Sequence, residues 1–208
     1  VAIDLAWHGE SGLGRKAWTI EAFGADVAAV VKKLGLQDVI LIGHSMGSDV
    51  IAEAACQLPG AVEGLVMVDQ YKKLGAGRSP EEVEAFATRI GTNFVDSVEV
   101  LVKRMFLPNS DSALIERVAT DMSSSPPAMA LEAFKSTLNY SRQITHTLDK
   151  LKLPVIAINA DNWPTDVASM EKYGVQVMIM SSVGHFLMME DPEGFNLLLK
   201  TAISKIGQ

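Results

Sequence analysis

Continuous apolar runs alternate along this chain with segments in which apolar side chains recur every three or four residues. The runs are typical of strands buried on both faces, and the recurring pattern is typical of amphipathic helices. The predicted strands comprise residues 1–5, 38–43, 65–69, 154–159 and 175–180, and the predicted helices between and after them comprise residues 23–34, 46–58 and 195–206. This alternation predicts an α/β fold, with a mostly parallel sheet flanked by helices.

Residues 71–152 interrupt the alternation, because they contain helical patterns and no convincing strand. Proline and serine residues at 108 and 123–127 separate the predicted helices, which comprise residues 80–90, 95–106, 112–122 and 128–151. We interpret this part as a helical cap inserted between two strands of the sheet. The prediction divides the chain into a core segment (1–70), a cap (71–152) and a second core segment (153–208).

Composition supports a globular protein and excludes several partners. The chain has 208 residues, of which 48% are hydrophobic and 21% charged, enough for one domain with a substantial core. A net charge of −7 disfavours nucleic acid as a partner. No apolar run approaches the ~18 residues of a membrane helix. The single cysteine, Cys56, favours a cytoplasmic location, and no Cys/His spacing suggests a metal or other cofactor.

The segment Gly43-His44-Ser45-Met46-Gly47 places a serine between a predicted strand and a predicted helix. A G-x-S-x-G sequence in that context is typical of a nucleophile elbow, a strained turn that holds the serine hydroxyl at the carboxyl end of the sheet. We expect both glycines to be required, because a side chain at either position would collide with the neighbouring strand or helix. The backbone N–H of Met46, at the start of the helix, is the expected donor to an oxyanion. Ser45 is therefore the candidate nucleophile.

A serine nucleophile needs a base, and the chain has four histidines. His185 follows the last predicted strand, which places it at the same edge of the sheet as Ser45. His44 is adjacent to the serine and is expected to point elsewhere. His146 is expected on a helix surface and His8 in a turn. His185 is therefore the candidate general base.

Four segments together resemble the α/β-hydrolase fold family: DLAWHGES (residues 4–11), GHSMG (43–47), GHF (184–186) and EDPEGF (190–195). Trp7 stands where the family usually has glycine. The resemblance covers essentially the whole chain. It implies a serine nucleophile, a histidine base, an acid, and a helical cap between two strands, which matches residues 71–152.

The acid has two candidate positions in this resemblance. In one, the acid follows the sixth strand of the family, where Asp69 ends the run Val66-Met67-Val68-Asp69. In the other, it follows the seventh strand, where a gapless alignment puts Trp163 at the acid's place and Asp161 two residues early. The segment INADNWPT resembles that of haloalkane dehalogenases whose acid follows strand six. We therefore favour Asp69 and keep Asp161 as the second candidate.

The family pattern begins with three strands and a His-Gly segment that are absent before residue 1. That segment supplies the second oxyanion N–H, and the third strand lies between the two strands expected here at residues 1–5 and 38–43. Since unpaired central strands are costly, we expect a preceding segment, a strand from a second chain, or direct pairing of these two strands. Of the three, the preceding segment is favoured.

These residues predict a serine hydrolase that cleaves a small ester-like or other activated acyl substrate through an acyl-enzyme. Met105 and Phe106 in the cap are candidate substrate contacts, and no cofactor is expected. Alternatives within the fold are a C–C bond hydrolase, a lactonase and a cofactor-free perhydrolase. A non-enzymatic ligand sensor and a non-catalytic remnant stay open. The sequence does not predict the oligomeric state.

Overall fold

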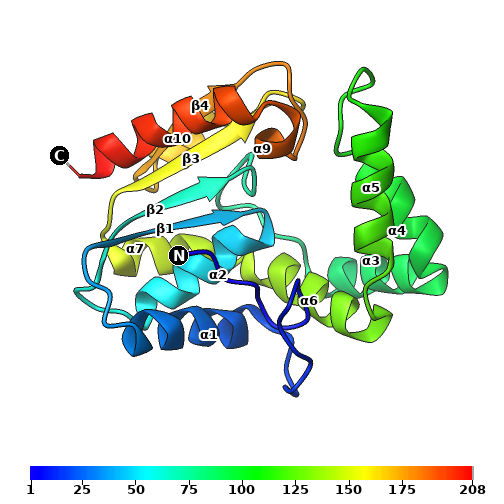
Figure 1. The fold of residues 1–208 in the computed structure, drawn as a ribbon, viewed down its shortest axis with the longest axis horizontal. Coiled ribbons are helices and arrows are strands. Elements are labelled where there is room, and N and C mark those ends of the chain that lie inside the picture. Colours follow the sequence, from blue (N-terminus) through cyan, green and yellow to red (C-terminus); the bar gives the residue numbers. More distant parts are fainter. Residues whose placement is uncertain (208) are drawn as a thin grey trace.

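One parallel sheet organises the molecule in the computed structural model, which describes residues 1–207; Gln208, the end of the second core segment, lies outside the described residues (Figure 1). Its strands are adjacent in chain order: β1 (Val39–His44), β2 (Val62–Val68), β3 (Val155–Ala160) and β4 (Val175–Met180). Every neighbouring pair is parallel. The predicted α/β fold with a parallel sheet is confirmed, and four of the five predicted strands lie where expected.

Helices cover both faces of this sheet (Figure 1). One face carries α1 (Ile20–Lys33), α2 (Met46–Cys56) and α7 (Ile144–Leu151), and the other carries α10 (Pro192–Ile206). The side chains of β2 alternate between the two layers. Leu65 and Met67 belong to the core under α2, and Val66 and Val68 to the core under α10. A continuous apolar run is thus buried on both faces, as its composition predicts.

The chain between β2 and β3 is helical and divides between two apolar cores. It forms α3 (Pro80–Thr92), α4 (Phe94–Lys103), α5 (Ser112–Ser123), α6 (Pro127–Tyr140) and α7. Helices α3 to α5 stand beside the sheet (Figure 1), and α4 and α5 share an apolar cluster that includes Phe94, Val102 and Phe106. Tyr140, Ile144 and Leu148 belong instead to the core beneath the sheet. The end of α6 and all of α7 are therefore part of the sheet's own packing.

The predicted single helix over residues 128–151 is wrong, since two helices occupy that stretch. The backbone turns at residues 141–143, where Gln143 N–H donates to Tyr140 O over 2.7 Å. The turn lets Tyr140 and Ile144 both face the same core. Packing of buried side chains outweighs the continuous helical pattern here. Two short helices, α8 (Val167–Glu171) and α9 (Leu187–Glu190), were not predicted.

The predicted strand over residues 1–5 is also wrong. Val1 is 90% exposed, and the backbone from Asp4 onward folds into local turns, with His8 N–H donating to Leu5 O (2.8 Å) and the Ser11 hydroxyl donating to Asp4 O (2.7 Å). Local partners satisfy groups that a sheet would otherwise have to pair. Direct pairing of residues 1–5 with β1, one of the three arrangements considered from the sequence, does not occur among the described residues.

In the part of the chain that the structure describes, β1 lies at the edge of the sheet, whereas its apolar run predicts a strand buried on both faces. It pairs with β2 alone among residues 1–207, and Ile42 is 44% exposed. Among residues 1–207, none of the helices combines the length and the apolar composition that a membrane-spanning helix requires.

Candidate active site

Ser45 occupies a strained turn between β1 and α2. Its backbone has φ 51° and ψ −127°, a combination that residues other than glycine rarely adopt and that costs about 1–3 kcal/mol. Two hydrogen bonds hold the turn: Ser45 N–H donates to Val68 O (2.8 Å), and the buried Ser48 hydroxyl donates to Gly43 O (2.7 Å). The turn fixes Ser45 at the carboxyl end of the sheet, beside the end of β2.

The two glycines of the motif are not equivalent. A Cβ on Gly43 would lie 2.2 Å from Gly47 O and 2.8 Å from Ser48 N, so the start of α2 packs directly on the end of β1. A Cβ on Gly47 would meet nothing within 4 Å among the described residues. The expectation that both positions exclude a side chain is therefore correct for Gly43 and wrong for Gly47, which points away from the strand.

His185 and Asp69 meet at the same edge of the sheet. The imidazole Nδ1 lies 2.8 Å from Asp69 Oδ2, and both residues are buried. A carboxylate oxygen only accepts, so Nδ1 carries a proton, and in the neutral form of the imidazole Nε2 has the lone pair. Within residues 1–207 no hydrogen bond joins this imidazole to the Ser45 hydroxyl.

Several groups hold Asp69 in place. Its Oδ1 accepts from the Lys72 ammonium (2.6 Å) and from Ala160 N–H (2.8 Å). Burial raises the pKa of Asp69, but the hydrogen bonds from His185 and Lys72 and the charge of Lys72 outweigh it, so the pKa lies below its usual range. The carboxylate is therefore ionised at neutral pH and able to stabilise an imidazolium.

Asp161, the second candidate acid, lies apart from this pair. It is exposed, and its Oδ1 accepts from Ser182 N–H over 3.0 Å. That contact joins the loop after β3 to the loop after β4. The structure brings Asp69 to His185 and gives Asp161 a different partner.

His44 contacts His185 directly, although the sequence suggested that it points elsewhere. Its Nε2 lies 2.8 Å from His185 O, and the two ring centroids are 4.5 Å apart. Burial, followed by the charge of His185, lowers the pKa of His44 to about 4, so His44 is neutral at pH 7. Its Nε2–H therefore donates to the backbone carbonyl of His185. The position of His44, directly before Ser45 at the strand end, was the signal for this contact.

The loop that carries His185 forms hydrogen bonds with the end of the α4 segment and with α9. His185 N–H donates to Met105 O (2.8 Å), and Gly184 N–H donates to the Glu190 carboxylate (2.8 Å). A Cβ on Gly184 would lie 2.5 Å from Met105 O, so the loop passes very close to the end of α4. Met105 thus contacts the backbone of His185 through its carbonyl oxygen.

Comparison with known proteins places this arrangement in a family. The model of the Alpha/beta hydrolase family matches residues 1–196. The chain belongs to the alpha/beta hydrolase family.

The relatives of this alpha/beta hydrolase include proteins named as different kinds of hydrolase. Lipase LipV of Mycobacterium tuberculosis is 31% identical over 103 residues, which span 50% of this chain and 38% of LipV. RutD of Escherichia coli, whose name describes a carbamate hydrolase, is 24% identical over 91% of this chain and 74% of its own length. The chain thus spans less than half of the first of these relatives.

A solved structure shares the fold across nearly the whole chain. A thermophilic esterase from Thermogutta terrifontis superposes with a TM-score of 0.79 at 22% identity, covering 98% of this chain and 79% of the esterase. At that identity the likeness concerns the fold.

Phe106, a candidate substrate contact, is buried beside the histidine loop of this alpha/beta hydrolase. It stacks on Phe186, with ring centroids 5.0 Å apart, and belongs to the apolar cluster of α4 and α5. Met105 is half-buried. Both residues lie next to His185.

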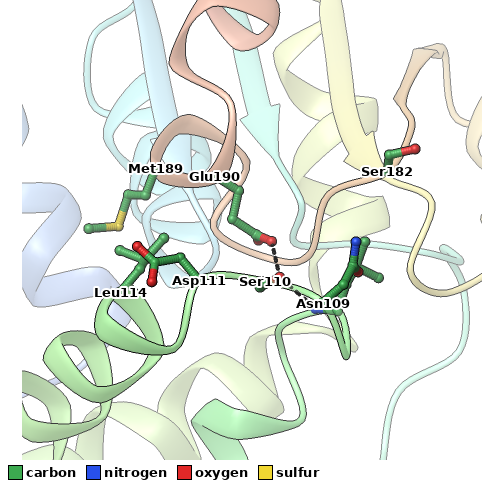
Figure 2. A pocket seen from close by; sticks show the side chains of 8 residues that line it. Asn109, Ser110, Asp111, Leu114, Ser182, Met189 and Glu190 are labelled. Atoms are coloured by element: carbon green, nitrogen blue, oxygen red, sulfur yellow. Dashed lines mark hydrogen bonds between the residues drawn. The ribbon is translucent and has the colours of Figure 1, made fainter.

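A cavity of about 290 Å³ lies between the α4–α5 connection and α9 (Figure 2). Polar side chains dominate its lining, and the Ser110 hydroxyl donates to Glu190 over 2.6 Å (Figure 2). Its lining residues are Leu107, Asn109, Ser110, Asp111, Leu114, Ser182, Met189 and Glu190. Ser45 and His185 are not among them, so this cavity adjoins the histidine loop without containing the candidate nucleophile.

A buried polar cluster, which the sequence does not predict, lies around Asp49 on α2, next to the site. Asp49, one turn into α2 from Ser45, accepts from the Tyr71 hydroxyl (2.5 Å), from Gln70 Nε2 (2.8 Å) and from the Thr137 hydroxyl. Gln70 and Tyr71 directly follow Asp69. One carboxylate therefore connects the helix behind Ser45, the segment after Asp69, and α6.

Proposed function

We propose that this chain is a serine hydrolase that cleaves a small ester-like or other activated acyl substrate through an acyl-enzyme. The observation that carries the proposal is the hydrogen bond of 2.8 Å between His185 Nδ1 and Asp69, at the sheet edge where Ser45 stands in its strained turn. The family and its lipase and esterase relatives support hydrolysis as the reaction class.

In this mechanism the Ser45 hydroxyl attacks the substrate carbonyl while His185 Nε2 takes its proton. The imidazolium is stabilised by Asp69 and then gives the proton to the leaving group as the carbon–oxygen bond breaks. An ester of Ser45 remains. Water attacks this ester with His185 again acting as the base, which releases the acid and restores the serine.

Met46 N–H is the proposed donor to the oxyanion. It is the first residue of α2, and the first N–H groups of a helix have no partner within the helix. The positive end of the dipole of α2 adds to the stabilisation of negative charge at this point. One oxyanion donor of this kind is worth about 10²–10³ in rate.

Helices α3 to α5 are the proposed cap over the site. They follow β2 at the carboxyl edge of the sheet, the edge where open α/β sheets bind ligands. Met105 and Phe106 follow α4 and contact the loop that carries His185. We assign these two residues the role of limiting substrate size.

The test uses the 208-residue chain and p-nitrophenyl acetate and butyrate. Ser45→Ala should abolish hydrolysis and labelling by a fluorophosphonate probe, while the circular dichroism spectrum stays unchanged. Ser204→Ala, an exposed serine on α10, is the matched control and should keep both activities. Hydrolysis that survives in Ser45→Ala would overturn the proposal.

The same assay separates the alternatives. Labelling of Ser45 without turnover favours a ligand sensor of the same fold over an enzyme. A much higher kcat/KM for opening a lactone, or for cleaving a C–C bond, than for any ester would change the proposed substrate class. The proposed nucleophile would stay the same.

A further inference from the structure

Lys72 introduces a full positive charge into the pair of Asp69 and His185. Its ammonium lies 2.6 Å from Asp69 Oδ1, while the imidazole lies 2.8 Å from Oδ2 of the same carboxylate. One carboxylate therefore serves two cationic partners whenever the imidazole is protonated. The motif that predicts an acid at this position does not require such a lysine.

The Lys72 ammonium is fixed by its surroundings. It donates a second hydrogen bond of 2.6 Å to Ala160 O, at the end of β3. The side chain is only 20% exposed and its Asp69 partner is 1% exposed, so solvent screens the charge less than at a surface ion pair. The ion pair is thus an ordered part of the site, in which the Lys72 ammonium has two hydrogen-bond acceptors.

We propose that Lys72 is a positioning residue which, through its ion pair with Asp69, sets the pH range in which His185 acts as the general base. The inference rests on the proposed function and deepens it. Lys72 offsets part of the negative charge that would otherwise stabilise the imidazolium of His185. The imidazole therefore loses its proton more readily, and the free base needed for attack by Ser45 persists to lower pH.

Other charged or titratable groups around His185 do not substitute for Lys72. His44 packs on the imidazole and is neutral, because burial lowers its pKa to about 4. Glu190 contacts the loop through Gly184 N–H, and Asp161 contacts it through Ser182 N–H. Both are acidic. Lys72 is the cation that the structure places on the carboxylate of Asp69 among residues 1–207.

The expected effect follows from the charge. An elementary charge a few ångströms beyond the carboxylate, in partly solvated protein, changes a titration midpoint by about 1 pH unit. In Lys72→Met the acidic limb of the pH profile of kcat/KM should move about 1 unit to higher pH. Lys72→Arg retains the charge and should restore the wild-type limb.

Lys73→Met is the matched control. Lys73 is adjacent in sequence, but its side chain is 61% exposed and its partner is Asp166, at 3.6 Å. This variant should leave the limb unmoved. If Lys72 only supported the fold, Lys72→Met would lower kcat/KM equally at every pH and the limb would stay in place.

A second readout keeps this inference separate from the proposed function. Histidine side-chain NMR follows the titration of the His185 imidazole without any substrate, and its midpoint should rise by about 1 unit in Lys72→Met. An unchanged midpoint and an unchanged limb would overturn the role of Lys72 while hydrolysis by Ser45 stands. A moved midpoint in a chain that hydrolyses nothing would sustain the ion-pair effect and defeat the proposed function.

Discussion

Replacement of Gly43 by alanine tests whether the end of β1 and the start of α2 are in direct backbone contact. The new Cβ would lie 2.2 Å from Gly47 O and 2.3 Å from Gly47 C. Ordinary contact requires more than 3 Å, so the first turn of α2 must retreat by about 1 Å. Overpacking of this kind costs about 1–3 kcal/mol, and we expect the upper end because the atoms that collide are backbone atoms.

The structural consequence should reach Ser45. Retreat of α2 would stretch the hydrogen bond from Ser48 Oγ to Gly43 O, now 2.7 Å, and release the strained backbone of Ser45. For a domain of this size, about 3 kcal/mol corresponds to a fall in Tm of about 6–12 °C. Labelling of Ser45 by a fluorophosphonate should slow by more than the loss of folded protein explains.

Gly47→Ala is the control for this prediction. A Cβ there meets nothing within 4 Å in the described chain, and alanine is favoured over glycine inside a helix by about 0.5–1 kcal/mol. Its Tm should be equal or higher. The assay is thermal unfolding followed by circular dichroism, together with labelling rates at a temperature where each variant is folded. Equal behaviour of the two variants would refute the packing argument.

Three further predictions concern the acid, a buried carboxylate and the cap. Asp69→Asn should lower kcat by up to ~10⁴ on p-nitrophenyl acetate, and Asp161→Asn should change it little; the reverse order would contradict the proposed acid. Burial raises the pKa of Asp49 to about 7, so between pH 4 and 7 the folded state binds more protons than the unfolded state does. The free energy of unfolding should therefore fall as the pH rises, by at most about 4 kcal/mol, and urea unfolding of Asp49→Asn should show a flatter dependence on pH. Met105→Ala and Phe106→Leu should change the preference for ester chain length more than the rate on acetate, and identical selectivity in both would contradict a role in substrate size.

Much of the fold follows from the sequence because apolar periodicity reports burial directly. The run of β2 is buried on both faces, and its pattern is unambiguous. The run at residues 1–5 is just as apolar, yet it makes no strand because its backbone bonds to its own turn around Asp4. Pattern alone states what a segment could bury, and pairing depends on which strand lies next to it.

The sequence predicts the candidate nucleophile and the candidate base more readily than the groups that contact them. Ser45 and His185 lie in short motifs whose spacing carries a mechanism. Asp49 and Tyr71 are 22 positions apart in the sequence, and Lys72 reaches Ala160 across 88 positions. Contacts over such separations leave no local pattern in the sequence. The buried cluster and the ion pair therefore follow from the three-dimensional structure alone.

Asp69 and Asp161, the two candidate acids, differ in a way that the hydrophobic pattern does not predict. Both residues follow the last residue of adjacent strands, β2 and β3, so topology brings both to the carboxyl edge of the sheet. The difference lies in the turn each makes. Asp69 adopts φ 49°, a left-handed conformation that aspartate tolerates, and Ala160 N–H and Lys72 hold one of its oxygens so that the other faces His185. Asp161 continues toward β4, where Ser182 N–H takes its carboxylate. The position of Asp69 beside His185 thus depends on one backbone turn and two donors, and the hydrophobic pattern reports none of these.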